Sequence, residues 1–185
     1  MIQLLYIIHL KNAEDYISLT CKCCGKKWVL TNEIFYIIIN TPKENTTMID
    51  YKALVKEAFE AQKKAYAPYS HWIVGAALIT RGGKVYHGCN IENNTFTPTV
   101  CAERVALFKA VSEGERDFQA IAIVGNDVNT PVGQGDYLSP CGVCRQVMTE
   151  FCTADFEIIL GKTYDDFKVY TLADLMPVMS LPLSK

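Results

Sequence analysis

The 185-residue sequence has no dense stripe of Lys and Arg, and it has no apolar run long enough to cross a bilayer. The apolar runs at residues 1–10 and 34–39 fall well short of the ~20 residues that a spanning helix needs. No basic residue precedes the first run and no small-residue cleavage site follows it, which excludes a typical secretion signal. We therefore expect a cytoplasmic protein with no membrane partner.

The charge balance disfavours a further class of partner. A net charge of −2 without clustered basic residues is a poor match for a nucleic-acid backbone, although it does not exclude an uncharged nucleoside. The eight cysteines occur in a chain that is half apolar, so metal binding and free thiols are favoured over a disulfide scaffold. The chain has no internal repeat and no low-complexity tract.

From Met48 onward the sequence alternates between helical and strand-like segments. Helices are expected over 51–66, 100–113, 141–151 and 172–176, and strands over 72–80, 84–91, 119–125, 156–160 and 168–171. Ser139 is expected to cap the helix over 141–151, with Pro140 at its first position. This order predicts an α/β or α+β fold: a three-layer sandwich whose mixed five-stranded sheet is flanked by helices. The first two strands should form an antiparallel hairpin, and the later crossovers favour parallel neighbours.

Residues 1–47 differ in texture and are interpreted as an irregular leader that ends in the polar segment TPKENTT. Cys21, Cys23, Cys24 and His9 resemble half of a zinc knuckle, but a matching second pair is absent. The favoured hypothesis is that the leader is dispensable, as an over-extended reading frame or a poorly ordered segment. Residues 48–185 would then be the catalytic domain.

Two short motifs about forty residues apart carry the chemistry: CAER at 101–104 and PCGVCR at 140–145. Together they supply three thiols, and three thiolates leave one position of a tetrahedral zinc ion open for water. The carboxylate of Glu103 is placed to handle the protons of that water. Both motifs open expected helices, whose N-termini stabilise thiolates. The pair of motifs predicts hydrolytic deamination of a base ring.

Each of these residues taken alone has an ordinary explanation. A Cys-x-x-Cys pair also occurs in redox motifs and zinc knuckles, Cys101 alone is most often a small buried hydrophobe, and Glu103 alone is a first-turn Glu. A structural zinc would need a fourth ligand, for which Cys89 and Cys152 are candidates outside any paired motif.

A site with three thiolates carries a net negative charge, which a neighbouring arginine can offset by donating to sulfur. Arg104 and Arg145 both lie beside expected ligands. Arg104 is favoured as the supporting residue because it directly follows Glu103.

At these residues the chain resembles cytidine deaminases of the small, homotetrameric, three-cysteine type. The resemblance covers about residues 48–185 and rests on AYAPYSHWIVGAAL, GCNIEN, CAERVALFKAVSEG and SPCGVCRQVMTEF. It implies the five-stranded fold and one zinc ion per subunit, held by Cys101, Cys141 and Cys144, with Glu103 as the proton shuttle. The implied reaction converts cytidine and deoxycytidine to uridine and deoxyuridine with release of ammonia, in pyrimidine salvage.

The resemblance also implies substrate contacts. Asn90 and Glu92 match the segment that holds the ribose hydroxyls, whereas without it they would be interpreted as a turn residue and a solvated carboxylate. The backbone around Ala102 is expected at the base edge. Trp72 stands where relatives usually have the Phe that packs on the pyrimidine, and the alternative is a core Trp on a strand.

The resemblance also implies a homotetramer in which neighbouring subunits contribute residues to each active site. The sequence departs from the family pattern at two places that bear on this assembly. Phe96 stands where many relatives have Tyr, so a hydroxyl contact near the sugar is missing. The tail at 177–185 lacks the aromatic residue that covers a neighbouring site in relatives, and Leu181 is a partial substitute.

Three competing functions remain open at this point. One is a zinc deaminase for another amine, such as a nucleoside antibiotic or a free base. Another is an editor of RNA or DNA, which commonly has His in the first motif and a basic surface. The last is a zinc-stabilised structural or binding module, against which Glu103 argues.

Overall fold

The computed structural model describes residues 6–9, 16–21, 27–31 and 49–177, and the chain divides into two compact units, 1–46 and 47–185. The first unit contains the antiparallel strands β1 (Tyr6–His9), β2 (Tyr16–Cys21) and β3 (Lys27–Thr31). The expectation of an irregular leader therefore missed these strands, whose aromatic and β-branched residues favour extended backbone.

The second unit is built around one mixed sheet of five strands. The elements in chain order are α1 (Tyr51–Gln62), β4 (Trp72–Thr80), β5 (Val85–Cys89), α2 (Ala102–Ser112), β6 (Phe118–Asp127), α3 (Gly142–Phe151), β7 (Glu157–Gly161), β8 (Phe167–Thr171) and α4 (Leu172–Leu175). The strand order is β5-β4-β6-β7-β8. Within the described part of the chain, no helix has the length and apolarity needed to cross a membrane.

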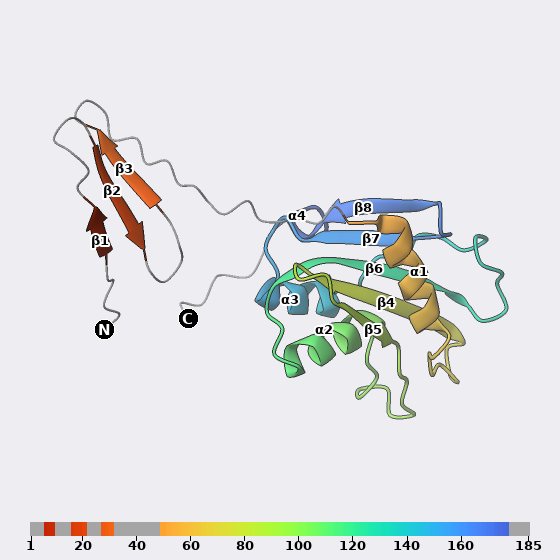
Figure 1. Ribbon diagram of the computed structural model, residues 1–185. Helices are drawn as coiled ribbons and strands as arrows, with labels where there is room; N and C mark the ends of the chain where they lie inside the picture. Colours follow the sequence, from red (N-terminus) through yellow and green to blue (C-terminus); the bar gives the residue numbers. More distant parts are fainter. Residues whose placement is uncertain (1–5, 10–15, 22–26, 32–48, 178–185) are drawn as a thin grey trace. The chain divides into compact units, whose positions relative to one another are not determined.

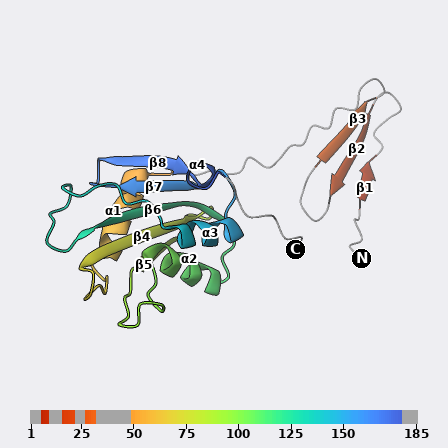
Figure 2. The ribbon, with the colours of Figure 1, turned by 180° about the vertical axis from the view of Figure 1, so that it is seen from behind.

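Helices cover both faces of this sheet, which confirms the predicted three-layer sandwich. Helix α1 packs on one face, and α2 and α3 pack on the other (Figure 1). Figure 2 shows the same layers from behind. Alternate residues of the central strands enter the two cores, so that Ala76 and Leu78 face α2 while Ala77 faces α1.

The strand directions agree with the sequence in part. Strands β4 and β5 form the predicted antiparallel hairpin, and β6 and β7 are parallel neighbours. The expectation of parallel neighbours is wrong for β4–β6 and for β7–β8, which are antiparallel. Strands β5 and β6 do run the same way across the α2 crossover, but β4 lies between them. A short turn joins β7 to β8, which makes that pair a second hairpin.

Helix α1 ends earlier than the expected residue 66. After Gln62 the chain leaves the helix, and the Tyr66 backbone forms a bridge with Ile91. The Tyr66 N–H donates to the Asn90 carbonyl at 3.0 Å, and the Glu92 N–H donates to the Tyr66 carbonyl at 2.8 Å. These two bonds attach the segment after α1 to the segment after β5, where the expected ribose ligands lie.

Close packing of α2 on the sheet depends on Gly88 in β5. A Cβ atom at this position would lie 2.2 Å from the Ala102 carbonyl oxygen and 2.5 Å from the Ala106 nitrogen. Both obstacles are helix backbone, which cannot move aside as a flexible side chain can. Gly88 therefore sets the distance between the sheet and the first turns of α2, which carry Cys101 and Glu103.

The variant Gly88→Ala is expected to lose about 1–3 kcal/mol of stability by overpacking, and to bind zinc less tightly because the start of α2 is displaced. Thermal unfolding and zinc content check this on one sample. Gly82→Ala is the matched control, since an added Cβ there meets nothing nearer than 3.6 Å. Wild-type stability and zinc content in Gly88→Ala would contradict the packing account.

Candidate metal centre

The three cysteines of the two motifs meet at the N-termini of two helices. Cys101 is the N-cap residue of α2, Cys141 is the N-cap residue of α3, and Cys144 lies in the first turn of α3. The Sγ atoms of Cys101 and Cys141 are 3.9 Å apart, and those of Cys141 and Cys144 are 3.5 Å apart. All three Sγ atoms lie within 4.8 Å of one another.

This spacing fits a single zinc ion. Thiolates at about 2.3 Å from a tetrahedral centre lie about 3.8 Å from one another, close to the separations found here. Within the part of the chain that the structure describes, this is the one group of three His, Cys, Asp or Glu side chains able to hold an ion. Cys89 and Cys152 stand outside it, so neither completes a closed structural site.

Neither Cys101 nor Cys141 uses its side chain to cap its helix. The thiols therefore remain available at helix ends whose unpaired N–H groups favour negative charge. A hydrogen bond from the Cys144 thiol lowers the pKa of Cys101 to about 5, with Arg104 and Cys141 acting in the same direction and partial burial opposing them. Cys101 is thus prepared to bind a cation as a thiolate.

Glu103 lies beside these thiols in the first turn of α2 and is 5% exposed. Burial raises the pKa of its carboxyl to about 7, and the charge of Cys101 raises it in addition. Its Oε2 atom has no hydrogen-bond partner among the described residues. A buried carboxyl oxygen without a protein partner is expected where a ligand supplies one.

The two arginines beside the ligands have different roles. Arg104 Nη2 lies 3.8 Å from Cys101 Sγ and donates to the Thr99 carbonyl at 3.2 Å, so Arg104 occupies the supporting position predicted for it. Arg145 donates to Ser139 Oγ and to two carbonyls instead of to sulfur. Helix α3 begins at Gly142 with Cys141 at the N-cap position, so the prediction that Ser139 caps it with Pro140 at its first position is wrong.

Asn90 completes the edge of β4 where β5 has ended. Its Oδ1 accepts from the Val74 N–H at 2.8 Å, and its Nδ2 donates to the Trp72 carbonyl at 2.8 Å. The side chain thus imitates a neighbouring strand, a role that the sequence did not reveal. Its Oδ1 can accept one further hydrogen bond, and its Nδ2 can donate one more.

Glu92 is held by a loop that precedes β4. Its carboxylate accepts from the Tyr69 N–H at 2.9 Å and from Ser70 Oγ, and these bonds lower its pKa. Glu92 is therefore a half-exposed carboxylate whose orientation is fixed by hydrogen bonds. Ser70 was missed as a supporting residue, although it lies inside the AYAPYSHW segment that carries the resemblance.

Trp72 and Ala102, the two residues expected to contact the base, differ in exposure. Trp72 begins β4 and is 41% exposed, so the alternative of a core Trp is wrong. Ala102 is fully buried at the first position of α2. Phe96 is 72% exposed, has a backbone φ of 62°, and packs edge-on against Tyr69 with ring centroids 6.3 Å apart.

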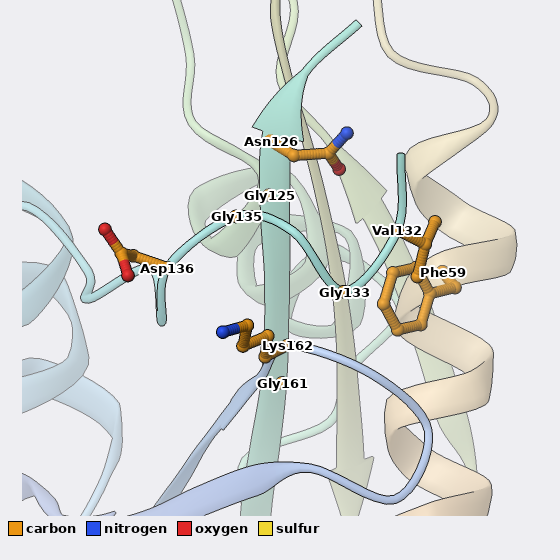
Figure 3. A pocket seen from close by; sticks show the side chains of 9 residues that line it. All are labelled: Phe59, Gly125, Asn126, Val132, Gly133, Gly135, Asp136, Gly161 and Lys162. Atoms are coloured by element: carbon orange, nitrogen blue, oxygen red, sulfur yellow. The ribbon is translucent and has the colours of Figure 1, made fainter. Parts of the chain in front are cut away.

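A small pocket elsewhere lies where β6 and β7 end (Figure 3). It is lined by Phe59, Gly125, Asn126, Val132, Gly133, Gly135, Asp136, Gly161 and Lys162. The Asn126 amide is already engaged, since it accepts from Gln62 at 2.7 Å and donates to the Asp127 and Thr130 carbonyls at 2.8 Å. None of the predicted site residues lines this pocket.

The remaining candidate residues lie apart from the three-thiol cluster or outside the described residues. Cys89 Sγ donates to the Lys64 carbonyl at 3.2 Å. In the first unit, His9 pairs with Ser18 while Cys21 pairs with Tyr6, three residues away along β1. Cys23, Cys24 and Leu181 lie outside the described residues.

The convergence of three thiols beside a buried acid is typical of zinc enzymes that keep one coordination position open, because purely structural sites close all four with protein ligands. A family model described as the cytidine and deoxycytidylate deaminase zinc-binding region matches residues 48–160. The chain belongs to this deaminase family.

Curated relatives agree with this assignment. The cytidine deaminase of Halalkalibacterium halodurans is 49% identical over 129 residues, covering 70% of this chain and 92% of that protein. The cytidine deaminase of Sporosarcina psychrophila is 46% identical over 129 residues, covering 70% of this chain and 90% of that protein. A crystal structure of cytidine deaminase from Burkholderia pseudomallei aligns with a TM-score of 0.65 and 43% identity, covering 71% of this chain and 100% of that one.

Proposed function

We propose that the protein catalyses zinc-dependent hydrolytic deamination of cytidine and deoxycytidine, giving uridine or deoxyuridine and ammonia. The observation that carries the proposal is the meeting of Cys101, Cys141 and Cys144 at two helix N-termini, with the buried carboxyl of Glu103 beside them. Cys101, Cys141 and Cys144 would hold the ion. When bound, zinc lowers the pKa of a water in its open position.

Glu103 moves the protons in this proposal. It takes a proton from the attacking water and delivers it to ring nitrogen N3, while the water oxygen forms a bond to C4. It then takes the remaining proton of that oxygen and passes it to the amine, the C4–N bond breaks, and ammonia leaves. A pKa near 7 suits a carboxyl that must both accept and donate.

The sugar and base are held by residues around the start of β4. Asn90 and Glu92 would bind the ribose hydroxyls, Trp72 would pack on the pyrimidine, and the backbone at Ala102 would contact the base edge. Glu92 remains ionised because its pKa is lowered by Ser70 and the Tyr69 N–H, so it accepts from a hydroxyl. The Ser70 contact also fixes its orientation.

The assembly proposed for the protein is a homotetramer acting in cytoplasmic pyrimidine salvage. Its support is a group of exposed apolar side chains in the segment before β4, at the first residue of β4 and in the segment after β5, whose burial by another subunit would be favourable. These side chains are Tyr66, Tyr69, Trp72, Ile91 and Phe96. Light scattering after size exclusion tests this, and a monomer at micromolar concentration with full activity would contradict it.

The activity is tested by measuring ammonia and uridine formation from cytidine and deoxycytidine with purified protein. A free base, a cytidine-like nucleoside antibiotic and a single-stranded oligonucleotide complete the panel. Turnover of the two nucleosides supports the proposal. Deamination of the oligonucleotide alone, or of the antibiotic alone, would replace the substrate assignment while leaving the zinc chemistry in place.

Arg104→Ala is expected to retain zinc and to lose turnover, because removal of the guanidinium at Cys101 Sγ leaves the negative charge of the thiolates uncompensated. The loss should be about 10-fold or more in kcat. Metal analysis and steady-state kinetics on one preparation check this. Unchanged kcat would remove Arg104 from the mechanism.

Residues 48–185 are proposed to be the catalytic domain and residues 1–47 to be dispensable. The second unit contains the whole five-stranded sheet, both cores and the three-thiol cluster. A chain of residues 48–185 is therefore expected to fold, bind zinc and deaminate cytidine at the full-length rate. An insoluble or inactive product would show that the first unit contributes to the fold or the site.

A further inference from the structure

Arg145, one residue after Cys144, binds two separate segments of the chain through its side chain. Its Nε donates to the Pro140 carbonyl at 2.8 Å, and its Nη2 donates to Ser139 Oγ at 2.8 Å. Its Nη1 donates to the Leu175 carbonyl at 2.7 Å. The guanidinium therefore fixes the two residues that lead into Cys141 and attaches them to the end of α4.

No side chain caps the N-terminus of α3, so the contacts of Arg145 are what orient the residues before it. Cys141 makes no side-chain capping bond, and Ser139 Oγ accepts a hydrogen bond from Arg145. The backbone N–H of Arg145 also donates to the Cys141 carbonyl at 3.0 Å. That last bond is the ordinary first-turn bond of a helix, whereas the guanidinium holds Ser139 and Pro140, the two residues before Cys141, and with them the direction from which the Cys141 thiol approaches the ion.

Helix α4 is a firm attachment point for this arginine. Leu172 is fully buried, and its N–H donates to the Phe156 carbonyl at 2.9 Å. Thr171 and Asp174 form a capping box at the start of the helix. The Leu175 carbonyl at its end is thereby held in place, and the planar guanidinium presents its donors in a rigid fork that a lysine lacks.

We propose that Arg145 is a positioning residue for the metal centre: its guanidinium holds Ser139 and Pro140 against α4 so that the Cys141 and Cys144 thiols converge with Cys101. Its guanidinium donates to Ser139 and to two carbonyls, not to sulfur, and it acts through Cys141 and Cys144, which precede it in the sequence. The inference rests on the zinc centre of the proposed function. Outer partners of this kind contribute about 10–100-fold to metal affinity.

The test compares zinc release from the full-length chain and from Arg145→Gln, with a chromogenic chelator in excess. Release from Arg145→Gln is expected to be at least about tenfold faster, with KM for cytidine unchanged while the variant is loaded. Arg145→Lys should also release zinc faster than the parent, because one ammonium cannot reach all three acceptors. This second variant keeps the test decisive if Arg145→Gln fails to fold.

Arg116→Gln is the matched control. Arg116 also donates to two backbone carbonyls, those of Val111 and Glu115, at the far end of α2. The Arg116→Gln variant should have a lower thermal stability than the parent and the same rate of zinc release. Parent-like release from Arg145→Gln, or equal acceleration in Arg116→Gln, would overturn the inference. Failure of the parent chain to bind zinc would instead overturn the proposed function.

Discussion

Replacing Glu103 with glutamine is expected to lower the deamination rate by about 10²–10⁴-fold while zinc content and thermal stability stay close to those of the parent. Glutamine keeps the shape of the side chain and fits the same buried site, but it can neither take a proton from water nor pass one to the leaving amine. The measurement is kcat for cytidine together with zinc content. A full ion with almost no turnover is the expected combination.

The control for this variant is Glu113→Gln at the other end of α2. Glu113 accepts from Lys84 and Tyr86 at the surface and has no contact with the thiols. Its replacement should change stability little, as for an exposed ion pair, and should leave kcat unchanged. Turnover within tenfold of the parent in Glu103→Gln would contradict the assignment of Glu103 as proton shuttle.

Removing the Cys144 thiol is expected to have the second large effect, because Cys144 is the fully buried member of the three-thiol cluster and its Sγ lies 3.5 Å from that of Cys141. Mutation of residues that only hydrogen-bond to metal ligands costs about 10–100-fold in metal affinity. Because Cys144→Ala removes a ligand itself, it should weaken zinc binding by more than about 100-fold and abolish turnover. Dialysed protein should then carry little zinc. Metal analysis after dialysis measures this directly.

Cys152→Ala is the matched control, because Cys152 ends the same helix and packs against the same core without belonging to the thiol cluster. It should lose stability through its smaller side chain and keep its zinc. Full zinc content in Cys144→Ala would contradict the ligand set. Loss of zinc in Cys152→Ala would show that metal content follows general stability.

The metal centre was largely predictable from sequence because its parts are local. Each motif opens a helix, and helix geometry alone brings Cys141 and Cys144 to one side of α3. The approach of Cys101 depends on how α2 packs on the sheet, and the motif pair predicted it only by implying a shared ion. Gly88 determines how closely α2 packs, and although it opens the GCNIEN segment that carries the resemblance, no periodic pattern shows that a helix lies against it.

The contacts that cross the fold were not predictable in the same way. Asn90 fills a gap at the edge of β4, and Arg145 reaches Leu175, which lies 30 residues away in the sequence. Neither pattern has a periodic signature, because both depend on where separate elements meet. The same reason explains the early end of α1, where Tyr66 bridges Ile91 instead of continuing the helix.

The most direct test of the central claim is to measure zinc content and ammonia release from cytidine on one purified sample of the full-length chain. The account predicts about one zinc per chain, set by a single three-thiol site, and one ammonia for each uridine formed. Protein that carries its zinc and releases no ammonia from any nucleoside would contradict it.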